Sequence, residues 1–271
     1  MQIDLPVRFA RKVTDSARDS HERNLDYKEL RWNLSVGETA LVLVDCWEHY
    51  PLESYQRRAN KICGTKIKPV LETCREIGVA VVHAPSPQWA ANYPTYHYKP
   101  ELPNERSQQD QKPSGPVASA DDWPPRSLTT EGEYALPRSE PVMNAWRNES
   151  NLDQLRIAGS VEPAGEDLVI STGTELHEFC REKRIKHLVY VGFATNFCVL
   201  FRDYGLHAMK QRGYNIIFIR DATTAVESRE TVNHLGATRA SVFYIEIVIG
   251  VSVTAETFVN ACKNVTAIRT T

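Results

Sequence analysis

A cysteine and an aspartate of this sequence could together form a hydrolase site. Each lies at the end of an apolar segment or shortly after one. Cys198 closes the run GFATNFC, which comes directly after HLVYV (187–191), and Asp45 ends the run ALVLVD (40–45). A thiolate attacks carbonyl carbons, and a nearby carboxylate can accept the thiol proton and later return it to a leaving group. We also expect Cys198 to begin a helix, where the helix dipole lowers the pKa of a thiol. Together the two residues predict a thiol hydrolase.

Each residue also has a common structural role that the sequence leaves open. A single cysteine near a strand end is often a small core residue, and an acid after a strand often caps a helix. Their placement favours chemistry, because ligands of open parallel sheets bind beyond the carboxyl ends of the strands. If the two strands are neighbours, Asp45 and Cys198 share one crevice, where the backbone N–H groups of residues 193–198 could hold an oxyanion.

The elements that would position the pair alternate along the chain. Short apolar runs are typical of strands buried on both faces, and segments of ten to fifteen residues between them have helical patterns. This alternation predicts an α/β fold with three layers around a doubly wound, mostly parallel, six-stranded, Rossmann-like sheet. We expect strands at 40–45, 79–84, 167–171, 187–192, 215–221 and 242–249, and helices at 67–77, 172–184, 198–213 and 227–240.

Two segments lack this alternation. Residues 1–37 are irregular in pattern, and we expect them to form an N-terminal arm. We expect residues 38–271 to form one hydrolase domain with an insert at about 85–160, which holds eleven of the fifteen prolines. An insert of this length without a regular pattern is typical of a functional covering or of a partly mobile segment.

The composition argues against several classes of function. A formal net charge of −2 over 271 residues does not suit a nucleic-acid-binding face, which is strongly basic as a rule. No apolar stretch approaches the ~20 residues that cross a bilayer, and the N-terminus lacks the apolar segment of a secretory signal. The six cysteines are scattered, which suits reduced thiols. We therefore expect a cytoplasmic protein that acts on a small-molecule substrate, with no nucleic-acid or membrane partner.

Several segments resemble the isochorismatase-like cysteine hydrolases, a superfamily that includes N-carbamoylsarcosine amidase, nicotinamidases and ureidoacrylate amidohydrolase. They are TALVLVDCWE (39–48), PAGEDLVI (163–170), GTELHEF (173–179), HLVYVGFATNFCV (187–199) and GYNIIFIRDATTA (213–225). The resemblance implies an amidohydrolase that cleaves a C–N bond of a small amide or carbamoyl compound through a thioester. It implies that Asp45 is the general base, that Cys198 is the nucleophile, and that a cis peptide bond joins Phe193 to Ala194 beside the oxyanion.

The sequence departs from the family pattern in two places. The family has a catalytic lysine shortly after the third strand, where this chain has Thr172; Lys99, Lys112 and Arg202 are candidate substitutes. The alternative is a catalytically weak or silent protein that kept the fold for binding or as a scaffold. The Asp-x-His metal motif of nicotinamidases is also missing from HAPSPQW (83–89). We therefore expect no metal and no other cofactor.

Three residues beside the proposed catalytic pair are candidates for substrate binding. Trp47 follows Asp45 closely, and Asn196 and Phe197 directly precede Cys198. The aromatic side chains could instead be packing residues, and Asn196 could instead hold the turn through a hydrogen bond to the backbone. A nucleotide-binding Rossmann domain is disfavoured because no G-x-G-x-x-G follows the first strand. By analogy with the family, we expect a homo-oligomer.

Overall fold

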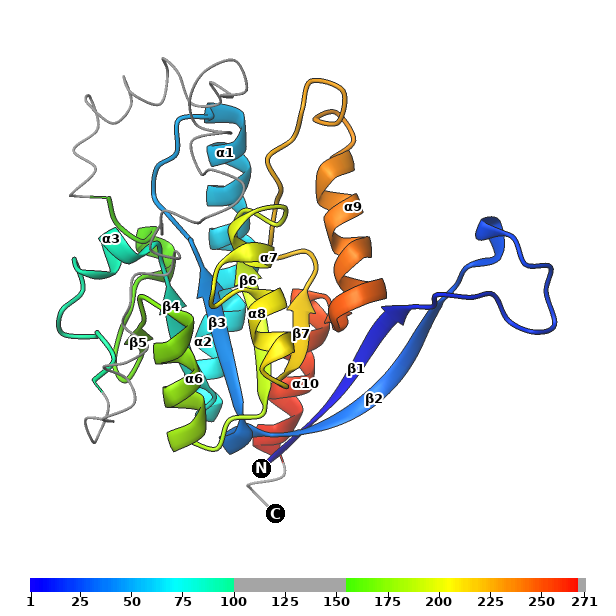
Figure 1. The fold of residues 1–271 in the computed structure, drawn as a ribbon. Coiled ribbons are helices and arrows are strands. Elements are labelled where there is room, and N and C mark those ends of the chain that lie inside the picture. Colours follow the sequence, from blue (N-terminus) through cyan, green and yellow to red (C-terminus); the bar gives the residue numbers. More distant parts are fainter. Residues whose placement is uncertain (100–154, 268–271) are drawn as a thin grey trace, which may run out of the picture. The chain divides into compact units, whose positions relative to one another are not determined.

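The structure, a computed structural model, describes residues 1–99 and 155–267. The residues up to Tyr98 and from Leu155 onward belong to one compact unit. An eight-stranded sheet with the order β2-β1-β8-β7-β6-β3-β4-β5 crosses this unit (Figure 1). The strands are β1 (Gln2–Ala10), β2 (Tyr27–Ser35), β3 (Thr39–Val44), β4 (Ala80–Ala84), β5 (Leu168–Val169), β6 (His187–Gly192), β7 (Asn215–Ile219) and β8 (Val251–Val253).

The predicted α/β fold with a doubly wound, mostly parallel sheet is confirmed, with eight strands rather than six. From β3 the chain moves outward through β4 to β5, then returns to the other side of β3 and continues through β6, β7 and β8. The strand order therefore reverses between β3 and β6. In open parallel sheets this reversal leaves a crevice at the carboxyl ends of the two strands.

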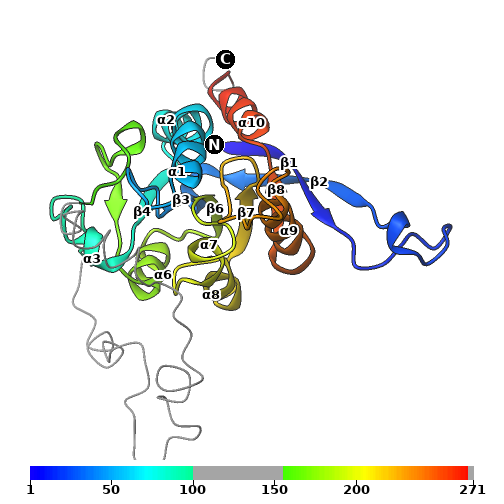
Figure 2. The ribbon, with the colours of Figure 1, turned by 90° about the horizontal axis from the view of Figure 1, so that it is seen from above.

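Helices cover both faces of the sheet (Figure 2). One face carries α1 (Glu53–Ile62), the π-helical turn η3 (Cys63–Ile67), α2 (Lys68–Ile77) and α10 (Ala255–Ala267), whose side chains share one core cluster. The other face carries α6 (Gly173–Glu182), α7 (Cys198–Phe201), α8 (Leu206–Gln211), α9 (Gly236–Tyr244) and the π-helical turn η8 (Ile245–Ile249). The remaining short helical turns are η1 (Glu22–Asn24), η2 (Val36–Glu38), α3 (Pro87–Ala90) and η7 (Gly159–Val161).

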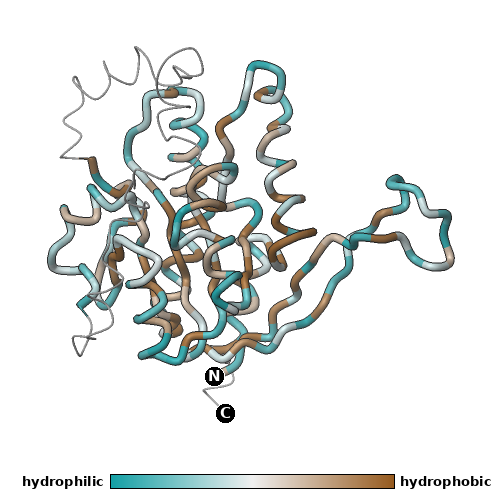
Figure 3. The backbone as a smooth tube through the Cα atoms, in the orientation of Figure 1, coloured by the Kyte–Doolittle hydropathy of each residue, from teal (hydrophilic) through white to brown (hydrophobic). Residues whose placement is uncertain are grey.

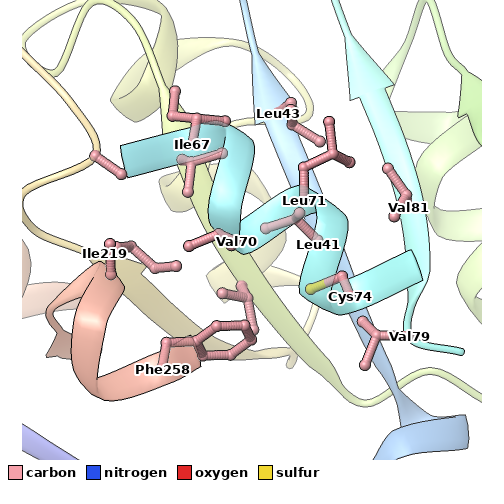
Figure 4. Packing of buried hydrophobic residues seen from close by; sticks show 14 of the residues in the cluster. Leu41, Leu43, Ile67, Val70, Leu71, Cys74, Val79, Val81, Ile219 and Phe258 are labelled. Atoms are coloured by element: carbon pink, nitrogen blue, oxygen red, sulfur yellow. The ribbon is translucent and has the colours of Figure 1, made fainter. Parts of the chain in front are cut away.

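The side chains of β3 show how the two cores form. Leu41 and Leu43 belong to the cluster under α2 and α10, whereas Val42 and Val44 belong to the cluster on the opposite face. Successive side chains of a strand point to opposite faces, so an unbroken apolar run is buried on both sides. Figure 4 shows Leu41 and Leu43 packed against residues of α2, with Phe258 of α10 close by.

The N-terminal segment is not irregular: it forms two strands of the sheet, contrary to the expectation. Strand β1 pairs antiparallel with β2 from Gln2↔Ser35 to Ala10↔Tyr27, and also with β8 at Arg8↔Ser252. The Arg8 guanidinium donates to the buried carboxylate of Glu246 in η8 at 2.7 Å, and the Ser252 hydroxyl donates to the same oxygen at 2.5 Å. These contacts hold the hairpin to the sheet, while its loop lies away from the other elements (Figure 1).

Three predicted elements differ from the structure. The expected strand 242–249 is the end of α9 followed by η8, and the strand β8 begins after it at Val251. The expected helix 198–213 is divided into α7 and α8, and the expected helix 227–240 begins only at Gly236. Figure 3 shows hydrophobic residues along both the central strands and α9, so the run at 242–249 has no polar face to distinguish helix from strand. Among the described residues, no helix combines the length and apolar composition needed to cross a membrane.

Candidate active site

The ends of β3 and β6 bring the two predicted catalytic segments together. The strands are parallel neighbours in the register Val44↔Gly192, so Asp45 and Phe193 leave the sheet side by side. The Phe193 N–H donates to the Val44 carbonyl oxygen at 2.9 Å. Gly192 has φ +115°, and a Cβ at this position would lie 2.0 Å from the Val44 oxygen. Only glycine allows this approach, which places Asp45 at the base of the 193–198 turn.

The carboxylate of Asp45 has two different oxygens. Oδ1 accepts hydrogen bonds from Trp47 Nε1 at 3.1 Å and from the Ser86 hydroxyl at 3.2 Å. Oδ2 is buried and has no hydrogen-bond partner among the described residues, although Arg202 Nη2 lies 3.8 Å from it. One oxygen is thus held in place by two donors, and the other remains available to accept a proton.

Burial raises the pKa of Asp45 to about 6. The interaction with the Cys198 thiol, the charge of Arg202 and the Ser86 hydrogen bond all oppose this shift. A carboxyl group with this pKa is mostly ionised at neutral pH and still takes up a proton readily. Asp45 therefore has the properties of a general base.

Cys198 is the first residue of α7, and its side chain is partly exposed. Burial and the neighbouring Asp45 carboxylate raise the pKa of its thiol to about 12, whereas Arg202 lowers it. The expected lowering by a helix dipole is outweighed, because α7 is only four residues long and a full negative charge lies beside the sulfur. The resting pair is therefore a protonated thiol next to a carboxylate, and no hydrogen bond of ordinary geometry joins them.

The turn between β6 and α7 has several backbone donors without an acceptor. The peptide bond between Phe193 and Ala194 is cis. The N–H groups of Thr195 and Val199 are taken by the carbonyl oxygens of Thr224 and Ala194. In the described part of the chain, no acceptor is bonded to the N–H groups of Ala194, Asn196 and Cys198. Free N–H groups in the turn that carries the sulfur are suited to hold a developing oxyanion.

The sequence of this chain also matches a protein-family model. The model described as "Isochorismatase domain" matches residues 39–246. The chain belongs to the isochorismatase family. The resemblance inferred from the sequence is thereby confirmed, and the match covers both Asp45 and Cys198.

Solved structures related to this isochorismatase-family chain are distant in sequence. A cysteine hydrolase from Pseudomonas syringae pv. phaseolicola 1448A is 15% identical, with a TM-score of 0.53 over 87% of this chain and 97% of that chain. N-carbamoylsarcosine amidase from Thermoplasma acidophilum is 18% identical, with a TM-score of 0.43 over 81% of this chain and 97% of that chain. At this identity the first similarity shows the fold alone. The comparison with curated proteins finds no match.

The three predicted substrate-binding residues of this family member have different surroundings. Both side-chain groups of Asn196 are bonded to the backbone of Val226, at 3.0 and 3.1 Å. Asn196 thus ties the turn at residues 193–198 to the loop after β7, which is the alternative role noted from the sequence. Phe197 is 53% exposed. Trp47 contacts Tyr50 and Trp89 at ring-centroid distances of 5.9 and 4.5 Å.

Sequence reasoning missed Ser86 and left Arg202 as one of three substitutes for the family lysine. Thr172, at the lysine position, caps α6 through its hydroxyl, which accepts from the Glu175 N–H at 3.2 Å. Lys112 lies outside the described residues, and Lys99 belongs to a separate unit of the chain, Lys99–Leu152. Ser86 follows β4, the neighbour of β3, so the rule that directed attention to Asp45 could have identified it.

The described residues contain no group of three or more His, Cys, Asp and Glu side chains that could hold a metal ion. His83, the histidine nearest to the family's metal motif, instead contacts Asp167 through Nε2 at 2.9 Å. Asp167 also binds Arg75, so this buried cluster joins β4 to the loop before β5. The described site is therefore built from a thiol, a carboxylate, a guanidinium and backbone N–H groups.

Proposed function

We propose that this isochorismatase-family protein is a cysteine hydrolase that cleaves a C–N bond of a small amide or carbamoyl compound. One observation carries the proposal: the buried carboxylate of Asp45 keeps one oxygen free and interacts with the Cys198 thiol. In this proposal Asp45 is the general base and Cys198 is the nucleophile. The N–H groups of Ala194 and Cys198 hold the oxyanion.

The reaction proceeds in two halves. Asp45 takes the thiol proton as the sulfur attacks the carbonyl carbon, and the carbonyl oxygen becomes an oxyanion. Asp45 then gives the proton to the leaving nitrogen, the C–N bond breaks, and a thioester remains. Water attacks the thioester while Asp45 accepts one of its protons. The C–S bond breaks, the acid leaves, and the proton returns to sulfur.

The test replaces Cys198 and measures hydrolysis of a panel of primary amides, ureides and N-carbamoyl amino acids. The parent protein should hydrolyse at least one compound, and Cys198→Ala should lower kcat by about a thousandfold or more. Cys262→Ala is the matched control, because it removes a thiol from the core beside α10. Equal activity of the parent and Cys198→Ala would refute the mechanism. Mass spectrometry of the quenched reaction should find the acyl adduct on the Cys198 peptide.

The second candidate is a catalytically silent binding or scaffold protein. The observation that favours it is Thr172 at the lysine position, with its hydroxyl used only to cap α6. Alkylation of Cys198 across a pH range separates the candidates. A hydrolase should show an alkylation rate that already increases near pH 6, where Asp45 ionises and the pair begins to share a proton. A silent protein should show no increase near pH 6 and should react only at much higher pH, because burial and the Asp45 charge raise the pKa of the thiol to about 12.

The proposal includes the domain organisation and the location of the protein. Residues 38–271 would form the hydrolase domain with an insert at about 85–160, most of which lies outside the described residues. The substrate would be a small molecule, with no nucleic-acid or membrane partner. All six cysteines are free, which supports a reducing compartment and hence a cytoplasmic protein.

The proposal also includes self-association through one surface, the outer face of α9 and η8. Its apolar residues, with the exposed Arg239 at their edge, have helical spacing: Ala240, Phe243, Tyr244, Ile247 and Val248. Phe243, Tyr244 and Val248 are 41%, 37% and 47% exposed. Neighbouring apolar side chains that stay exposed are typical of a protein–protein contact surface. Antiparallel contact between two copies would set the small Ala240 against the larger Ile247 and Val248, so a second copy of the chain suits this surface.

A further inference from the structure

Arg202 and Cys198 lie on the same side of one helical turn. They are four residues apart, and the Arg202 N–H donates to the Cys198 carbonyl oxygen at 3.1 Å. Residues at this spacing are neighbours on a helix surface. The guanidinium interacts with the thiol, and its Nη2 lies 3.8 Å from Asp45 Oδ2. The side chain is 36% exposed, so it borders the site without being closed off from substrate.

Ser86 fixes the position of this guanidinium. Arg202 Nη2 donates to the Ser86 hydroxyl at 2.5 Å, and that hydroxyl donates to Asp45 Oδ1 at 3.2 Å. Ser86 is 1% exposed and follows the end of β4. The Tyr204 hydroxyl donates to the adjacent Pro85 carbonyl oxygen at 3.0 Å, which holds this loop against the segment after α7. Ser86 therefore links the cation to the carboxylate.

We infer that Arg202 is the catalytic cation of this site and that Ser86 is its positioning residue. The inference rests on the proposed hydrolase function and deepens it. In the resting site, part of the charge of Arg202 is balanced by the Asp45 carboxylate. When Asp45 takes the thiol proton it becomes neutral, and the guanidinium is then left to pair with the thiolate and with the oxyanion. This interaction grows along the reaction coordinate, which is the condition for catalysis.

The chemistry of arginine suits this role. A guanidinium keeps its charge at every relevant pH and presents several donors in a fixed plane. Nη2 serves both Ser86 and Asp45, whereas Nε is buried and has no hydrogen-bond partner among the described residues. A buried donor without a partner is costly, so a partner that appears during the reaction is favourable. The thiolate and the oxyanion are such partners.

The first experiment measures alkylation of Cys198 by iodoacetamide across a pH range and needs no substrate. The other five cysteines are buried, and mass spectrometry of the Cys198 peptide keeps the readout specific. Arg202→Met should slow alkylation at pH 7 about tenfold or more and move the profile to higher pH. Ser86→Ala should shift the profile in the same direction by less. Arg239→Met removes an exposed arginine of α9 and should leave the profile unchanged.

The second experiment restores the charge. Arg202→Lys should recover most of the alkylation rate, and added methylguanidinium should raise the rate of Arg202→Ala but not that of the parent. A purely structural Arg202 would not respond to a diffusible cation. An Arg202→Met profile equal to the parent would overturn the inference. If Arg202→Met does not fold, an Arg202→Lys profile as slow as that of Arg202→Ala would overturn it.

The two proposals fail in different ways. Retained amide hydrolysis by Cys198→Ala would refute the cysteine mechanism, and the alkylation profiles would be unaffected. Unchanged alkylation in Arg202→Met would refute the role of Arg202, and hydrolysis that depends on Cys198 would still stand.

Discussion

Asp45 has a strained backbone conformation and a buried, charged side chain. Its φ of +44° lies in the left-handed region, which aspartate tolerates better than most residues. The residue is 3% exposed, and among the described residues its carboxylate accepts two hydrogen bonds, both at Oδ1. Burying a charge with an unused oxygen destabilises the folded state. This cost is expected of a residue kept for chemistry.

The first prediction at this scale concerns stability. Burial raises the pKa of Asp45 from 3.8 in the unfolded chain to about 6 in the folded protein, so its contribution to stability decreases as the pH rises through 6. Asp45→Asn removes the ionisable group and keeps an acceptor for Trp47 and Ser86. At pH 7.5 it should stabilise the protein by up to about 3 kcal/mol, since the two pKa values differ by about 2.2 and each pKa unit is about 1.4 kcal/mol. Thermal unfolding measures this.

The stabilisation of the folded state by Asp45→Asn should disappear at low pH. Below about pH 3 the carboxyl is mostly protonated in both states, so the parent and Asp45→Asn should have nearly the same Tm. The exposed Asp19→Asn is the control and should change Tm little at either pH. A variant that is less stable than the parent at pH 7.5 would contradict the buried-charge explanation. Hydrolysis by Asp45→Asn should be lost throughout.

The second residue-scale prediction concerns the pH dependence of hydrolysis. Because the ionised form of Asp45 is the base, kcat/KM should fall with unit slope as the pH decreases through about 6. The Ser86 hydrogen bond lowers the pKa of Asp45, so Ser86→Ala should move this limb to higher pH. A profile that is flat between pH 5 and 7 in the parent would contradict the assignment of the base.

The sequence indicated the proposed pair, Asp45 and Cys198, more directly than the residues around it. Asp45 and Cys198 lie at apolar runs that are recognisable without a structure. Arg202 was one of three candidate cations, and choosing it, or recognising Ser86, requires knowing that β4 is the neighbour of β3. Asn196 lies within the motif, so its position suggested substrate binding, whereas both of its side-chain groups hold Val226.

At the scale of elements, α9 shows why periodicity failed. The run VFYIEIVI (242–249) is apolar in nearly every position, and a buried strand and a helix without a polar face have the same signature. The one charged residue of the run, Glu246, points inward to Arg8 and Ser252. Its position in the sequence therefore does not show which side of the helix faces the solvent. The hairpin of β1 and β2 was missed for a related reason. Its second strand is an exposed edge with charged residues, and alternation is weak there.

The element-scale prediction concerns the contact between β3 and β6. Gly192→Ala would place a methyl group 2.0 Å from the Val44 oxygen, at a φ of +115°. The two strands would have to separate, so the variant should lose more than about 4 kcal/mol or fail to fold. Gly213→Ala is the matched control, because Gly213 has φ +95° and nothing within 4 Å of its Cβ position. It should cost about 1 kcal/mol. Urea unfolding compares the two, and similar losses would contradict the close approach.

At the scale of the whole molecule, the sequence predicted the doubly wound, mostly parallel sheet, because alternating strands and helices leave few other topologies. The adjacency of β3 and β6 was only a condition of the proposed site, and the structure shows it. The two added strands form a hairpin with each other, and their charged, exposed residues hid the strand pattern. The insert at about 85–160 lies mostly outside the described residues. The described residues end at Lys99 and resume at Leu155; the Tyr98 N–H donates to the Val169 carbonyl oxygen of β5, and Asn92, just after α3, donates to the Leu155 carbonyl oxygen.

The whole-molecule prediction concerns self-association through the outer face of α9. Phe243, Tyr244 and Val248 stay exposed on that face in the described part of the chain, which favours a second copy as its cover. Phe243→Glu combined with Val248→Glu should shift the protein to a monomer in light scattering after size exclusion, because two charges would be buried per copy. Leu30→Glu, an exposed site on β2, should leave the assembly unchanged. A monomeric parent at micromolar concentration would contradict the proposal.

The short distance along the chain between Cys198 and Arg202 has an evolutionary consequence. A sulfur and its counter-charge encoded within five codons are inherited as a unit, so position 172 is released from selection for a basic side chain. Relatives should therefore divide into two lineages, one with lysine after the third family strand and one with arginine four residues beyond the cysteine. Sequences that carry neither should have lost the cysteine as well.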